Sequence, residues 1–131
     1  EQKQNYLKNI VVNMAFQALE AGLDGIVCSG HELETLNRYS ELDGLLKVVT
    51  AIRPDYHIDK DDQRRTITPH DAILKGADHI VVGRPITSYM KKPKKKNSKK
   101  NIFYPQSFPH AGYSVLWEVH YALEKLEKEG N

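Results

Sequence analysis

Apolar side chains recur every three or four residues between Asn5 and Ala21, which is the spacing of one face of an α-helix. Gly22 follows directly. Glycine often ends a helix because it adopts a left-handed backbone conformation without a steric penalty. The pattern therefore predicts a helix over residues 5–21, whose apolar face carries Leu7, Val11, Met14, Ala18 and Leu19.

Three short apolar runs follow this helix along the chain, and they lack the helical spacing. They are Gly25 to Cys28, Leu46 to Thr50 and His79 to Val82. Continuous runs of this length are typical of strands that are buried on both faces, as in a parallel sheet covered by helices. The sequence therefore predicts three parallel strands.

A helix is predicted after each of the three strands. After the first, Ser29 and Glu32 have the spacing of a capping box, which predicts a helix that extends to about Tyr39. After the second, Thr68 is placed to cap a helix whose first turn contains a proline, and Gly76 ends it.

The last helix is predicted over residues 113–129. Its outer side carries the oppositely charged pair Glu124 and Lys128, four residues apart. We interpret Trp117 and Tyr121, also at helical spacing, as packing residues. The apolar face of this helix is predicted to carry Leu116, Val119, Leu123 and Leu126.

The pattern Gly-x-Asp-x-Ile-Val occurs twice, at residues 22–27 and 76–81, with one predicted strand between the two copies. One strand-and-helix unit therefore occupies about 27 residues, close to the ~30 of a βαβ crossover. Such regular units favour a (β/α) barrel over an open parallel sheet, although the open sheet is not excluded.

An eight-stranded barrel needs at least ~200 residues, whereas this chain has 131. Three strands and four helices would leave an apolar inner face and two unpaired strand edges in water. We expect the missing strands to come from an N-terminal segment or from a separate polypeptide.

Charge is distributed unevenly along the chain. The net charge is +2, but Lys91 to Lys100 contains seven lysines, so the rest of the chain is acidic. This run has no interleaved aromatic residues, and we interpret it as a solvated insertion at 91–101. Nucleic-acid binding is not expected from it.

The composition of the whole chain limits the class of protein. Hydrophobic residues make up 40% of it, but no run reaches the ~18 apolar residues that a membrane span requires. The chain starts with Glu1 and shows no signal peptide. Its single cysteine, Cys28, cannot form an intrachain disulfide. We expect a globular cytoplasmic protein, seen as a fragment or a processed piece, with no membrane partner.

The candidate chemistry lies where two of the strands end. The strand at 79–82 leads into Gly83 and Arg84, and Arg53 follows the strand at 46–50. Glycine lets a ligand approach a backbone N–H closely, and the planar guanidinium group suits the oxygens of a phosphate. The arginines could instead form ordinary surface ion pairs, but both follow a buried strand and precede a proline. We favour an anion-binding site.

The sequence gives little support for a metal site or a nucleophilic catalytic site. The acidic segment from Asp55 to Asp62 lacks the glycine of a calcium-binding loop. The six histidines have no metal-ligand spacing, and no Ser/His/Asp arrangement stands out. Cys28 reads as a packed core thiol rather than a nucleophile. These residues therefore predict no metal site.

Taken together, these motifs resemble the orotidine 5′-phosphate decarboxylase family. Their order and spacing match the last three strand-loop units of that family's (β/α)8 TIM barrel, so the resemblance makes residues 1–131 the C-terminal half of a decarboxylase domain. One departure is Thr50-Ala51, where the family usually has Thr-Pro-Gly. The matching motifs are Gly22 to Ser29, Lys47 to Thr50, Ile52 to Pro54, Asp62 to Arg65, Thr68-Pro69 and Gly83 to Thr87.

The resemblance implies a lyase that converts orotidine 5′-phosphate to UMP and carbon dioxide in pyrimidine biosynthesis, without metal or cofactor, as a homodimer. The family's catalytic signature, Asp-x-Lys-x-x-Asp on an early strand, has no counterpart here, so no catalytic residue is expected in this chain. It also implies that the strands at 46–50 and 79–82 are the seventh and eighth. The implied nucleotide-binding positions are Arg53, Gln63, Gly83 and Arg84.

Two other readings remain open. Another phosphoribosyl-substrate barrel enzyme would share the phosphate loops and differ in its catalytic residues. A non-catalytic phosphate-binding or RNA-associated module would use the lysine run at 91–100. The residues upstream of Glu1 would discriminate best, because Asp-x-Lys-x-x-Asp there would favour the decarboxylase.

Overall fold

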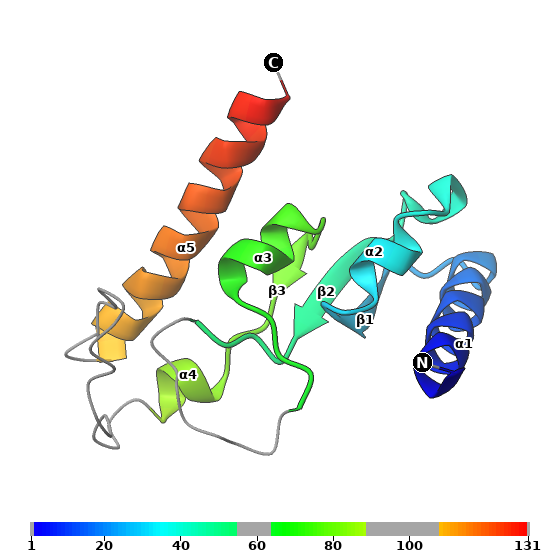
Figure 1. Cartoon of the computed structure of the whole chain (residues 1–131), viewed down its shortest axis with the longest axis horizontal. Coiled ribbons are helices and arrows are strands. Elements are labelled where there is room, and N and C mark those ends of the chain that lie inside the picture. Colours follow the sequence, from blue (N-terminus) through cyan, green and yellow to red (C-terminus); the bar gives the residue numbers. More distant parts are fainter. Residues whose placement is uncertain (1, 55–63, 89–107, 131) are drawn as a thin grey trace.

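A computed structural model describes residues 2–54, 64–88 and 108–130 of the chain (Figure 1). Helices and strands alternate along most of this length. The elements are α1 (Gln2–Glu20), β1 (Gly25–Ser29), α2 (Leu33–Leu36), the short 3-10 helix η1 (Ser40–Leu42), β2 (Leu46–Thr50), α3 (Pro69–Leu74), β3 (His79–Ile80), α4 (Arg84–Thr87) and α5 (Phe108–Glu129).

The three predicted strands form one parallel sheet in the order β1-β2-β3, which confirms the α/β class. Val27 of β1 is aligned with Val48 of β2, and Val48 is aligned with His79 of β3. β3 is shorter than predicted, although the Val81 N–H still donates to the Val49 carbonyl at 2.8 Å. Each strand reaches its neighbour through a segment that contains a helix, as parallel strands require.

The repeated Gly-x-Asp pattern has a structural cause. Gly22 and Gly76 both have positive φ, +73° and +85°, and each ends a helix in the same hydrogen-bonding pattern. The N–H of the glycine donates to a carbonyl three residues back, and the next N–H donates to one five residues back. This Schellman motif needs a left-handed residue, which glycine provides without strain. The repeat therefore encodes the helix-to-strand turn.

Two helices, α2 and α4, differ from the sequence expectation. α2 ends at Leu36 instead of about Tyr39, and only half of the capping box forms. The Glu32 carboxylate accepts the Ser29 N–H at 3.0 Å, but the Ser29 hydroxyl accepts from the N–H of His31. α4 is an additional short helix that the sequence did not predict.

The start of α3 is as predicted. The Thr68 hydroxyl accepts the Asp71 N–H at 3.0 Å, and Pro69 occupies the first turn, where its missing N–H costs nothing.

The two faces of the sheet have different surroundings. One face, with Ile26, Cys28, Val49 and Ile80, packs against the helices and forms the core. The opposite face carries Val27, 70% exposed, and Val81, 50% exposed. Strands of a parallel sheet are normally covered on both faces, so this chain presents an open apolar sheet face, as the count of strands predicted.

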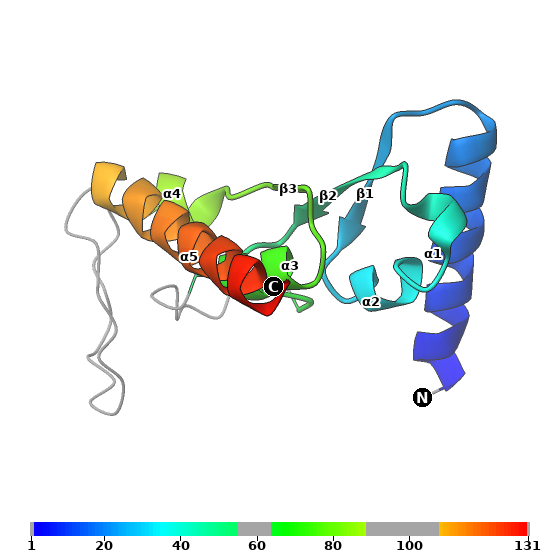
Figure 2. The ribbon, with the colours of Figure 1, turned by 90° about the horizontal axis from the view of Figure 1, so that it is seen from above.

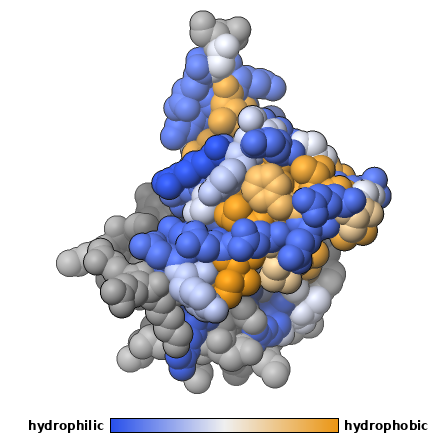
Figure 3. Space-filling view, turned by 90° about the vertical axis from the view of Figure 1, so that its right-hand side faces the viewer, coloured by the Kyte–Doolittle hydropathy of each residue, from blue (hydrophilic) through white to orange (hydrophobic). Residues whose placement is uncertain are grey.

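The helices at the two ends of the sheet also expose apolar side chains. α1 and α5 lie at opposite ends, as Figures 1 and 2 show from two directions. Figure 3 shows apolar side chains gathered on the α1 side of the molecule. The exposed apolar residues of α1 are Tyr6, Leu7, Ile10 and Met14.

α5 packs on α3 and α4 through its small residues Ala111, Val115 and Ala122. The face predicted to be apolar carries the exposed leucines Leu116, Leu123 and Leu126, which nothing among the described residues buries. Trp117 is 71% exposed, so its interpretation as a packing residue was wrong for this chain. The pattern marked side chains that need a partner, and the described segments do not provide one.

Ala51 has a φ of +58°, a left-handed conformation that costs an L-residue roughly 1–2 kcal/mol. Replacing Ala51 with glycine should therefore raise the free energy of unfolding by about 1 kcal/mol, measured by urea denaturation of the full chain. The matched control is Ala18→Gly inside α1, which should lower it by roughly 0.5–1 kcal/mol. Equal destabilisation by both substitutions would contradict strain at Ala51.

Candidate functional site

Three of the predicted site residues are described, and they follow two neighbouring strands of the sheet. Because the strands are parallel, the chain leaves β1, β2 and β3 at the same edge (Figure 1). Arg53 follows β2, and Gly83 and Arg84 follow the neighbouring β3. The structure thus places these three described positions on the same side of the molecule, at the carboxyl ends of adjacent strands.

Arg53 is fixed by its backbone. Its N–H donates to the Ile67 carbonyl at 2.8 Å, and its Nη1 donates to the Ile52 carbonyl at 2.8 Å. The side chain is partly exposed and lines a cavity of about 300 Å³ together with Gly30, His31, Thr68 and Lys75. The guanidinium group can contact an anionic ligand there. The Asp71 carboxylate also lines this cavity, whereas Gly83 and Arg84 do not.

Gly83 and Arg84 are arranged differently from the sequence expectation. They were expected directly after a strand at 79–82, but β3 ends at Ile80, and Gly83 is the N-cap of α4, of which Arg84 is the first residue. Both are exposed, and a Cβ built on Gly83 would have no atom within 4 Å. The open space around Gly83 is what close approach of a ligand to the backbone needs.

Gln63 lies outside the described residues, as do the acidic segment 55–62 and the lysine-rich run 91–101. The predictions for these segments remain predictions.

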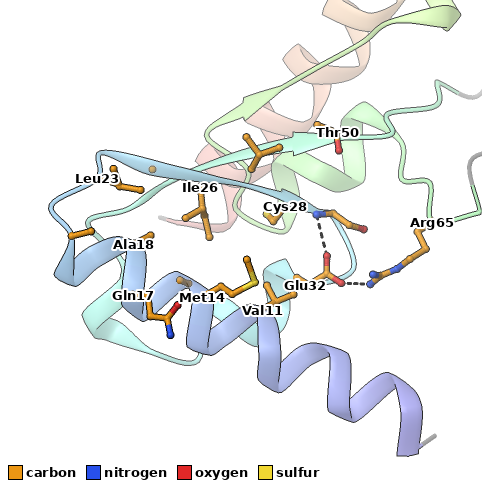
Figure 4. Close-up of a pocket in the computed structure, with 15 residues that line it drawn as sticks. Val11, Met14, Gln17, Ala18, Leu23, Ile26, Cys28, Glu32, Thr50 and Arg65 are labelled. Carbon is orange, nitrogen blue, oxygen red and sulfur yellow. Dashed lines mark hydrogen bonds and ion pairs between the residues drawn. The ribbon is translucent and has the colours of Figure 1, made fainter.

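The sequence interpretation missed an ion pair between Glu32 and Arg65. Glu32 is 3% exposed, and its Oε1 pairs with the Arg65 guanidinium while its Oε2 accepts the Ser29 N–H (Figure 4). The capping-box spacing identified Glu32, but only for its own helix. No local signal connects it to Arg65, which is 33 residues away.

Cys28 is buried, as predicted. Burial raises the pKa of the Cys28 thiol to about 11, the nearby Glu32 carboxylate adds to the increase, and Lys47 opposes it. The thiol is therefore protonated at neutral pH and a poor nucleophile.

A cavity of about 800 Å³ lies between β1 and α1. The Ile26 side chain of β1 points across it toward α1 (Figure 4).

Within residues 2–54, 64–88 and 108–130, no group of three or more histidine, cysteine or acidic side chains could hold a metal ion. None of the helices described there is long and apolar enough to cross a membrane.

A sequence model of the orotidine 5′-phosphate decarboxylase / HUMPS family matches residues 1–100. The chain belongs to this family. Its fold is a TIM barrel, so the three-stranded parallel sheet is a part of such a barrel, and the open inner face is the face that a closed barrel would enclose.

Relatives of this decarboxylase-family chain are similar over a limited length. It is 43% identical over 81 residues to an orotidine 5′-phosphate decarboxylase of Lactococcus lactis subsp. cremoris, covering 62% of this chain and 33% of the relative. The corresponding enzyme of Nitrosococcus oceani is 47% identical over 78 residues, again 33% of its length. That of Actinobacillus pleuropneumoniae is 49% identical over 78 residues. The matches thus span about a third of these relatives.

Proposed function

We propose that this chain is the C-terminal, phosphate-binding part of an orotidine 5′-phosphate decarboxylase, which forms UMP and carbon dioxide in pyrimidine biosynthesis. The observation that carries the proposal is the placement of Arg53, Gly83 and Arg84 after adjacent parallel strands of a decarboxylase-family chain. TIM-barrel enzymes frequently bind phosphate with the loops that follow their seventh and eighth strands.

The role of each residue follows from its chemistry. The guanidinium groups of Arg53 and Arg84 donate paired hydrogen bonds to phosphate oxygens, and the exposed backbone at Gly83 allows the phosphate to come close. Gln63 is proposed as an additional amide donor. Binding energy from a remote phosphate can be used to stabilise the transition state at the reacting ring. This chain therefore contributes substrate affinity and orientation.

The proton chemistry belongs to residues that this chain does not contain. The family resemblance assigns it to lysine and aspartate residues on early strands, without metal or cofactor. We therefore propose that the chain works with the N-terminal part of the barrel, in the same or a separate chain, and that the complete enzyme is a homodimer. The open sheet face around Val27 and Val81 supports such a partner, because exposed apolar sheet surface favours association.

The test is a hybrid enzyme, in which this chain replaces the matching third of the Lactococcus lactis decarboxylase. The hybrid should release carbon dioxide from orotidine 5′-phosphate, because the relative supplies the catalytic strands and this chain supplies the phosphate site. The control hybrid carries Arg53→Ala and Arg84→Ala together. A folded hybrid that binds UMP no better than uridine would contradict the proposal.

A further inference from the structure

We infer that Glu32 is a positioning residue, which holds Arg53 at the phosphate site through the segment Arg65–Ile67. The inference rests on the proposed role of Arg53 in phosphate binding. It assigns a task to a buried carboxylate that has no direct access to that ligand.

Glu32 joins the end of β1 to the segment that returns toward β2. One carboxylate oxygen accepts the Ser29 N–H, and the other pairs with Arg65. The Glu32 side chain is 4% exposed, whereas that of Arg65 is 42% exposed. A buried carboxylate is strongly destabilising when it lacks a partner, so this pair constrains where residue 65 lies.

Two residues farther on, Ile67 is held on both sides. Its side chain fills the place of the missing Cβ of Gly30, since a Cβ there would lie 2.6 Å from the Ile67 Cδ1. On the other side, Ile67 forms a parallel bridge with Ile52, and its carbonyl accepts the Arg53 N–H. A chain of contacts therefore connects Glu32 to the backbone of Arg53.

The segment before Arg53 needs such support. Ala51 is held at a φ of +58°, which an alanine adopts only when its surroundings impose it. The bridge between Ile52 and Ile67 directly follows this strained residue. If the Glu32–Arg65 pair is lost, Ala51 can relax, and the direction of the Arg53 side chain changes.

The test is a double-mutant cycle in the hybrid enzyme, with the affinities for UMP and uridine measured by calorimetry. Glu32→Gln keeps an oxygen for the Ser29 N–H and removes the charge that holds Arg65. This substitution should lower the affinity for UMP about tenfold and the affinity for uridine less than about twofold. In an Arg53→Ala background, Glu32→Gln should change the UMP affinity by less than about twofold, because the group that it positions is gone.

The matched control is Glu41 of η1, an exposed carboxylate that does not line the cavity of Arg53. Substitutions of exposed side chains usually have small effects, so Glu41→Gln should leave both affinities unchanged. Glu32→Asp keeps the charge and should recover part of the UMP affinity.

Equal losses for UMP and uridine, or the same loss with and without Arg53, would overturn the inference and assign Glu32 to folding alone. If Arg53→Ala by itself leaves the UMP affinity unchanged, the proposed phosphate role of Arg53 fails, and the inference fails with it. If the Glu32→Gln variant does not fold, Arg65→Gln removes the exposed partner of the same pair. Its affinities for UMP and uridine are then measured with and without Arg53→Ala.

Discussion

Purified residues 1–131 are expected to release no measurable carbon dioxide from orotidine 5′-phosphate. The lysine and aspartate residues that the family resemblance assigns to the chemistry have no counterpart in this sequence. The structure adds a second reason, because Val27 and Val81 face an open side of the sheet. A site that water enters freely loses the low dielectric in which charged groups stabilise a transition state.

The measurement is release of labelled carbon dioxide by the chain alone, beside the hybrid enzyme. The blank is a preparation purified identically from cells without the chain, which excludes contaminating enzyme. Turnover by the chain above this blank would contradict the prediction. It would show that residues 1–131 contain a catalytic group that the resemblance does not assign.

In the hybrid enzyme, Arg84→Ala is expected to lower the affinity for UMP at least about tenfold, because hydrogen bonds to charged groups contribute about 1.5–3 kcal/mol each. Arg84 is exposed, directly follows the open backbone at Gly83, and begins a helix anchored by the buried Pro85. The main chain of Arg84 is therefore held beside the open backbone of Gly83. Uridine has no phosphate and should bind equally weakly before and after the change.

Two further variants in the hybrid enzyme sharpen this measurement. Arg84→Lys should restore only part of the UMP affinity, since an ammonium group keeps the charge and loses the planar fork. Arg38→Ala removes another exposed arginine, two residues after α2, and should leave both affinities unchanged. Equal losses of UMP and uridine affinity in Arg84→Ala would instead assign Arg84 to the fold, and the site would have to be withdrawn.

The sequence by itself determined the elements whose causes are local. Gly22 and Gly76 end their helices because each must adopt a left-handed conformation, and Thr68 caps α3 through its own hydroxyl. The short apolar runs identified all three strands, and the spacing of motifs along the chain was enough to recognise the family. The sequence also predicted that Arg53 and Arg84 follow strands, and parallel strands bring such residues to one edge.

Only the tertiary structure decided what depends on contacts between distant residues. Glu32 meets Arg65 across 33 residues, and Ile67 pairs with Ile52, so neither contact has a signal in its own neighbourhood. The left-handed Ala51 is likewise maintained by surroundings that its own residue type disfavours. The apolar stripe of α5 shows the same limit, because a pattern specifies which side chains need covering, whereas the path of the whole chain decides whether anything covers them.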